Sequence, residues 1–137
     1  MARPVLDVGF FQKIGVGMLP GEMGVEILEI GKGFTRSRMK IEKRHLAPNG
    51  YLHAASVIAL ADTSAGYGCV ASLPEGAKGF TTIELKTNFL GTVVEGVLGC
   101  AAKAEHLGRT TQLWDAIVSS EAGKTLALFR CTQLIIR

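Results

Sequence analysis

Residues 49–73 read NGYLHAASVIALADTSAGYGCVASL, and Asp62 is the one charged side chain in this otherwise apolar, small-residue stretch. The apolar part, residues 54–73, is long enough for a helix of roughly 18 residues rather than a strand. At 3.6 residues per turn one face of that helix carries small or apolar residues around Asp62, at positions 55, 58, 59, 62, 65, 66 and 69. The sequence therefore predicts a long helix whose narrow face holds an acid toward a cleft or a subunit interface.

A carboxylate in such surroundings is costly unless it has a partner or a task. Two interpretations of Asp62 follow from the helix alone. In the first it is a reactive or ligand-binding acid in a cleft. In the second it is a structural acid, satisfied by a neighbouring backbone group or a basic side chain.

The rest of the chain predicts one short helix and six strands around the long helix. Residues 6–14 have the pattern of a short amphipathic helix with Asp7 as its N-cap. Extended segments follow at 24–30 and 33–42, joined by a turn at 31–33, and residues 45–52 read as a loop. After the long helix, alternation with period two begins at 81–89, and further extended runs cover 93–106, 110–120 and 125–136.

This order predicts an α+β fold in which one long helix covers an antiparallel sheet, because short turns between consecutive strands favour antiparallel pairing. A single helix cannot bury both faces of such a sheet or close its edges. We therefore expect the subunit to dimerise.

Composition limits the function classes. The chain of 137 residues fits a single domain over 1–137, is 47% hydrophobic, and carries a net charge of only +3, too scattered for a nucleic-acid partner.

Cys69, Cys100 and Cys131 are widely spaced among apolar residues, which predicts buried thiols in a reducing compartment. No secretory leader or uninterrupted membrane span is apparent, so we expect a soluble, cytoplasmic protein without a membrane partner. His45 and His106 lack ligands at metal spacing, so neither a metal nor another cofactor is expected.

The segment NGYLHAA at 49–55 followed by LADT at 60–63 resembles the hotdog-fold acyl-CoA thioesterases, in particular the phenylacetate-degradation (PaaI-like) group and related aryl-CoA thioesterases. The likeness covers nearly the whole chain. Segments GFTTIELKTNF at 79–89 and HLGRT at 106–110 add support, because they are similar to the strand after the helix and to a hairpin near the CoA phosphates. The resemblance implies a hotdog fold, an antiparallel sheet wrapped around one long central helix.

The resemblance also implies a site. An acid on the central helix acts as nucleophile or as general base, which assigns Asp62, while a backbone N–H at the start of that helix polarises the thioester carbonyl. Ala55, with Ala54 beside it, takes the donor position. His53 and Asn49 shape the preceding loop, although the Asn49 segment is also ordinary turn chemistry.

The substrate implied is an acyl-CoA, with an aryl-CoA and a short- or medium-chain acyl-CoA as the candidates. Coenzyme A is part of the substrate, and no separate cofactor is implied. Arg109, with Lys86 or Lys103 near it by strand geometry, is predicted to meet the CoA phosphates; solvated turn charges are the alternative. Thr63 is a further substrate-side candidate. The site is expected to combine residues of two subunits in a homodimer or a dimer-of-dimers tetramer.

Four positions depart from the family pattern. Ala54 and Ala55 stand where the family usually has two glycines, Ala47 stands where related aryl-CoA thioesterases carry an amide, and Gly66 replaces a hydroxyl one turn beyond the acid. Two other functions therefore stay open at this point, a hotdog hydratase or dehydratase and a non-catalytic acyl-CoA binder.

Overall fold

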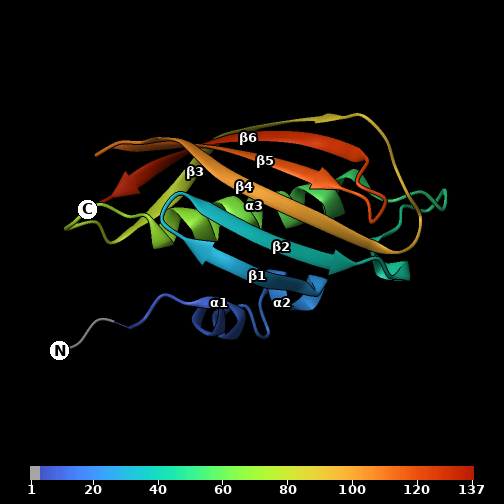
Figure 1. Cartoon of the computed structure of the whole chain (residues 1–137), viewed down its shortest axis with the longest axis horizontal. Helices are drawn as coiled ribbons and strands as arrows, with labels where there is room; N and C mark the ends of the chain where they lie inside the picture. Colours follow the sequence, from blue (N-terminus) through green and yellow to red (C-terminus); the bar gives the residue numbers. More distant parts are fainter. Residues whose placement is uncertain (1–3) are drawn as a thin grey trace.

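A computed structural model describes residues 4–137 and contains one six-stranded antiparallel sheet that curves around a long helix (Figure 1). The helices are α1 (Val8–Ile14), α2 (Leu19–Met23), the 3-10 turn η1 (Lys43–His45) and the long α3 (Ala54–Ala71). The strands are β1 (Val25–Gly31), β2 (Phe34–Lys40), β3 (Gly79–Phe89), β4 (Val97–Leu107), β5 (Thr111–Ser119) and β6 (Thr125–Ile136). Their spatial order is β1-β2-β4-β5-β6-β3.

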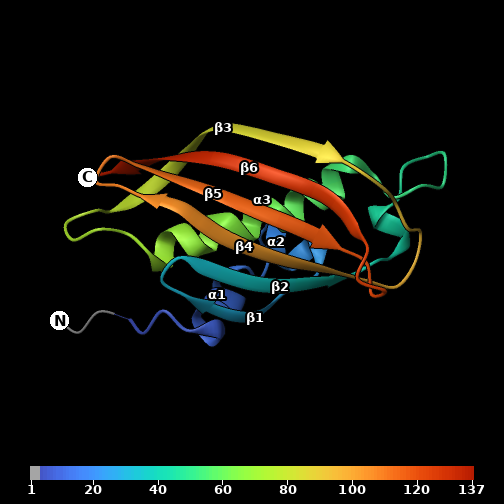
Figure 2. The same cartoon turned by 45° about the horizontal axis from the view of Figure 1, so that its top comes forward.

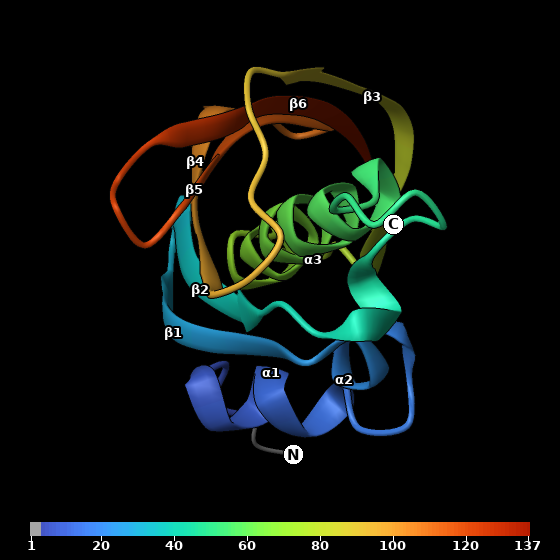
Figure 3. The ribbon, with the colours of Figure 1, turned by 90° about the vertical axis from the view of Figure 1, so that its right-hand side faces the viewer.

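Helix α3 forms the centre of the core, and the end-on view shows the sheet wrapped around it (Figure 3). Leu60 and Ala65 of α3 and Trp114 of β5 are fully buried between helix and sheet. The fold is thus the expected α+β hotdog fold. By length and composition alone, α3 could span a membrane. Half of its 18 residues are buried inside this subunit, however, as in the core helix of a folded domain.

The sequence placed most of these elements correctly. The Asp7 side chain accepts a hydrogen bond from the Phe10 N–H at 2.9 Å and so caps α1 as predicted. Helix α2 was not expected, because Pro20 and Gly21 looked like helix breakers; proline is nevertheless tolerated in the first turn of a helix. The fourth strand begins at Val97 rather than at 93, since Gly96 has a φ of +98° and interrupts the extended backbone.

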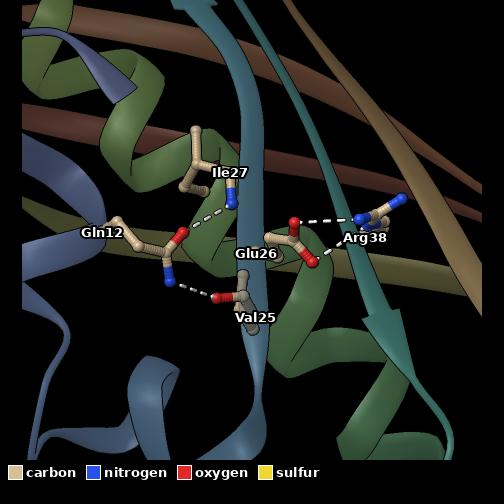
Figure 4. Close-up of polar contacts among 5 residues, drawn as sticks. All are labelled: Gln12, Val25, Glu26, Ile27 and Arg38. Atoms are coloured by element: carbon tan, nitrogen blue, oxygen red, sulfur yellow. Dashed lines mark hydrogen bonds and ion pairs between the residues drawn. The ribbon is translucent and has the colours of Figure 1, made fainter. Parts of the chain in front are cut away.

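The two edges of the sheet differ. At the β1 edge, the Gln12 side chain from α1 donates to the Val25 carbonyl at 3.1 Å and accepts from the Ile27 N–H at 2.9 Å (Figure 4). It occupies the place that another strand would take. At the opposite edge, β3 pairs only with β6, and Figure 2 shows it as the outermost strand there. Leu85 and Phe89 of β3 are 42% and 46% exposed. Strand β3 is therefore the open edge.

We expect Gln12→Ala to lower the free energy of unfolding by about 1–2 kcal/mol, because it leaves a backbone donor and acceptor of β1 without partners. Gln12→Glu is the matched control, since a carboxylate still accepts from the Ile27 N–H but cannot donate to the Val25 carbonyl. Urea unfolding should rank Gln12→Glu between wild type and Gln12→Ala. Equal stability of all three proteins would show that the edge contact contributes nothing.

Candidate active site

Asp62 lies half-buried in the middle of α3. Its Oδ1 is enclosed and has no hydrogen-bond partner, and none of the ion pairs within residues 4–137 involves it. Burial raises the pKa of the Asp62 carboxyl above its ordinary value. The interpretation of Asp62 as an acid neutralised by a basic neighbour is therefore not supported within this subunit. An orphaned, partly desolvated carboxylate is what a reactive acid requires.

Neither Cys69 nor Cys131 offers a thiolate nucleophile near Asp62. Burial, with a smaller contribution from the negative charge of Asp62, raises the pKa of the Cys131 thiol to about 12, and burial does the same for Cys69. Both thiols stay protonated at neutral pH and are free, as the sequence predicted. Within the described residues no group of His, Cys, Asp and Glu side chains is arranged to hold a metal ion. Asp62 is therefore a candidate reactive group: a partly buried carboxyl whose Oδ1 has no hydrogen-bond partner.

One turn beyond Asp62, the backbone of Gly66 lies against an aromatic ring. A Cβ built on Gly66 would sit 3.1 Å from Cζ of Phe80 on β3. The ring of Phe80 therefore occupies the space beside Gly66 into which a larger side chain at position 66 would extend. The small residue at position 66 allows this close approach of β3 to the helix.

At the start of α3, His53 is the N-cap residue, and its Nδ1 accepts a hydrogen bond from the Ala55 N–H at 2.9 Å. In this structure the Ala55 N–H, which the resemblance assigns to the thioester carbonyl, is bonded to the histidine ring instead. Within the described residues the Ala54 N–H has no acceptor, so it is the available donor. His53, Ala54 and Ala55 are all exposed, as a ligand-facing helix end would be.

Asn49 forms a turn. Its Oδ1 accepts from the Tyr51 N–H at 3.1 Å, and Gly50 that follows it has a φ of +86°. The side-chain oxygen of Asn49 therefore shapes the loop, as in an ordinary Asx turn. Thr63 follows Asp62 on α3 and is half-buried. It therefore stays a candidate for substrate contact next to the acid.

Lys86 and Arg109 are not brought together. Lys86 pairs in register with Arg130 of β6, and both line a hollow on the outer face of the sheet, the face that α3 does not cover. Arg109 lies in the turn before β5, whose first residue Thr111 is opposite Leu134. On β6, Arg130 and Leu134 are four positions apart, which is about 13 Å along a strand. The expectation that Lys86 lies near Arg109 is wrong within one subunit, and so is the same expectation for Lys103, which pairs with Asp115.

Sequence reasoning missed the role of His45. It is completely buried at the end of η1, and both ring nitrogens make short contacts to backbone atoms. In the sequence His45 has no partner at metal-ligand spacing, and no other motif contains it. Its position after three charged residues gave no signal of burial, which depends on packing against α2.

The comparisons with known proteins agree on one family. The family model described as "Thioesterase superfamily" matches residues 49–127. A 1,4-dihydroxy-2-naphthoyl-CoA hydrolase from Listeria monocytogenes is 30% identical over 80% of this chain and 89% of its own length. The protein of the same name from Escherichia coli is 27% identical over 90% of both chains. The crystal structure of a thioesterase from Haemophilus influenzae is 25% identical, covers 95% of this chain and 90% of its own, and superposes with a TM-score of 0.88.

Proposed function

Because this chain belongs to the thioesterase superfamily and is an acyl-CoA thioester hydrolase, we propose that it cleaves aryl-CoA or short- to medium-chain acyl-CoA thioesters with the Asp62 carboxylate. The observation that carries the proposal is the unpartnered Oδ1 of Asp62 within a helix face of small residues. The products are the free acid and coenzyme A.

Asp62 acts either as the nucleophile or as the general base for water. Attack by the carboxylate on the thioester carbon forms an anhydride and expels the CoA thiolate, after which water hydrolyses the anhydride. In the alternative route the carboxylate removes a proton from water as the water attacks. Both routes require the ionised carboxylate. The raised pKa of Asp62 makes it a stronger base than an exposed aspartate, and partial burial keeps the carboxylate poorly solvated.

The negative charge that develops on the thioester oxygen needs a hydrogen-bond donor. The free N–H of Ala54 begins α3, eight residues before Asp62, and therefore lies about 12 Å from it along the helix axis. Two groups so far apart cannot act on one carbonyl. We infer that the start of α3 from a second copy serves Asp62 of the first, which makes the site a property of a homodimer.

The open β3 edge supports such a dimer. Its exposed backbone and its partly exposed Leu85 and Phe89 provide a surface on which a second copy can pair strand to strand and bury apolar area. A two-fold axis at this edge would make the contact self-complementary. Sedimentation or light scattering is expected to give two subunits, or four as a dimer of dimers.

An aromatic acyl group is the substrate class we favour. Two relatives bear the name 1,4-dihydroxy-2-naphthoyl-CoA hydrolase, which is an aryl-CoA hydrolase by that name. The face of α3 around Asp62 carries small residues such as Ala59, and the Phe80 ring that packs against Gly66 one turn away supplies an apolar wall for an aromatic group. We place the chain among the PaaI-like and related aryl-CoA thioesterases on these grounds.

Thiol release from a panel of acyl-CoAs tests the proposal. Wild type and Asp62→Asn are run side by side with benzoyl-, naphthoyl-, butyryl- and palmitoyl-CoA, and free thiol is measured with a disulfide reagent. We expect release that depends on Asp62 and is fastest for the aryl substrates. Release that is unchanged in the variant would remove Asp62 from the mechanism, and absence of release from every substrate by folded protein would overturn the function.

We propose that Arg109 contacts the CoA phosphates. It is exposed in its turn, and the Arg137 side chain donates to the Arg109 carbonyl at 2.9 Å, which fixes the backbone there. Arg109→Ala is expected to raise KM for an acyl-CoA about three- to fivefold, as for an exposed ion pair, and to leave KM unchanged for the same acyl group on N-acetylcysteamine. Lys86→Ala is the control for loss of a positive charge elsewhere on the surface, and it is expected to leave KM unchanged for both substrates. Equal changes on both substrates would reject the phosphate contact.

We propose a cytoplasmic location. The three thiols are free and buried, which suits a reducing compartment, and a CoA thioester is the substrate class proposed here. Cell fractionation with an antibody against the chain would check this.

A further inference from the structure

The His45 ring joins two segments that are distant in the sequence. It is fully buried, its Nδ1 accepts from the Glu42 N–H at 2.8 Å, and its Nε2 lies 2.7 Å from the Met23 carbonyl oxygen. Since the Glu42 N–H can only donate and the Met23 carbonyl can only accept, the ring must be neutral with its proton on Nε2. One ring therefore fastens the end of α2 to the start of η1.

The backbone of His45 continues this connection to α3. Its carbonyl oxygen accepts from the His53 N–H at 3.0 Å and from the Ser56 Oγ at 2.8 Å. Ser56 is buried in the first turn of α3, and His53 is the N-cap of that helix. In Figure 3 the segment between β2 and α3 lies beside α2 and next to the near end of α3. His45 thus links α2, η1 and the start of α3 through four hydrogen bonds.

We propose that His45 is a positioning residue for catalysis, which holds the start of α3 where its free N–H meets the thioester oxygen. This inference rests on the proposed function, because it assigns that N–H to the site. Hydrogen-bond donors aimed at a developing charge act only when they are held within a few tenths of an ångström of the required place. In the loop from 46 to 52, Leu46 and Leu52 pack against the core while residues 48–51 are exposed, so the hydrogen bonds of His45 are the polar connection that fixes the helix start.

No other side chain matches both ring contacts. Asparagine places an acceptor close to the position of Nδ1, and glutamine reaches the position of Nε2 with a donor, so each preserves one contact of the two. His45→Ala preserves neither. These three substitutions therefore form a graded series that changes the connection between α2 and η1 without touching the residues that face the substrate.

The series is compared with Ile135→Ala, which removes a buried side chain at the far end of the sheet and destabilises without altering the start of α3. We expect His45→Ala to lower kcat about tenfold and to leave KM within about twofold, since the donor acts on the transition state. The two single-contact variants should recover part of kcat. Ile135→Ala should keep kcat within about twofold. A kcat in His45→Ala that equals that of Ile135→Ala at matched stability would overturn the positioning role.

Amide hydrogen exchange separates this inference from the proposed function. In His45→Ala, exchange at the His53 and Ser56 amides should be at least about tenfold faster, while amides in the second half of α3 exchange as in wild type. This readout does not depend on turnover. If wild type releases no thiol but the amides respond, the proposed function fails and the structural link stands. Unchanged exchange at both amides would overturn the inference whatever the activity.

Discussion

Asp62→Asn should lower thiol release by at least about 100-fold and, at neutral pH, make the protein more stable than wild type. The loss of activity follows because an amide is neither a nucleophile nor a base at this pH. The gain in stability follows because the native wild type holds a partly buried charge without a partner, whereas asparagine is neutral. An inactive variant that is also less stable would show that Asp62 has a structural role instead.

The gain in stability has a definite pH dependence. Because burial raises the pKa of Asp62 in the folded state, the folded protein binds the proton more tightly than the unfolded chain does. Wild-type stability from this group therefore falls as pH rises from the unfolded pKa, about 3.9, through the folded pKa. Urea unfolding should give a difference between Asp62→Asn and wild type that is largest at pH 7.5 and shrinks toward acid pH. A difference that grows toward acid pH would contradict the raised pKa.

Gly68→Ala should lower the free energy of unfolding by about 3 kcal/mol, the upper end of the usual cost of overpacking a core. A Cβ at this position would lie 2.5 Å from Cη2 of Trp114 and 2.8 Å from Oγ1 of Thr35. Both side chains are fully buried, and the indole N–H of Trp114 donates to Gln112 at 2.8 Å, so the ring has no free direction in which to move. Urea or thermal unfolding measures the loss.

Gly66→Ala in the same helix is the matched control. Its Cβ would meet only the ring edge of Phe80 at 3.1 Å, and alanine gains up to about 1 kcal/mol over glycine in a helix interior. The net change in stability is expected to stay within about 1 kcal/mol of wild type. Equal losses in Gly66→Ala and Gly68→Ala would mean that helix propensity or backbone freedom, rather than the close contact with Trp114, sets the cost.

The strong periodic signals of the sequence were sufficient for the fold. The run from 54 and the alternation after 79 predicted α3 and the later strands because each pattern extends over many residues and reflects a continuous buried face. The predictions of individual elements fail where a single residue sets the start or end of a helix or strand. A single glycine, Gly96, delays β4, and Pro20 opens a short helix instead of ending one. Local propensity does not distinguish these outcomes before the surrounding segments are placed.

The site was predicted less completely than the fold. Asp62 could be singled out because an isolated charge in an apolar run is visible in the sequence. The occupation of the Ala55 N–H by His53 and the buried state of His45 depend on side-chain geometry that no spacing rule contains. The distance between Lys86 and Arg109 depends on strand register, which is set by all strands of the sheet together.

The Gln12 side chain also has a consequence for the proposed homodimer, because it affects how many copies could join sheet edge to sheet edge. A subunit with two open sheet edges can accept a neighbour at each, so that addition continues into a fibre, as with a monomer that has two reactive ends. In the dimer proposed above, Gln12 closes the β1 edge of each copy and β3 is the edge that the described residues leave for pairing, so a continuous sheet would end at two subunits. One side chain of the seven-residue helix α1 would thus prevent further copies from adding to the sheet at β1.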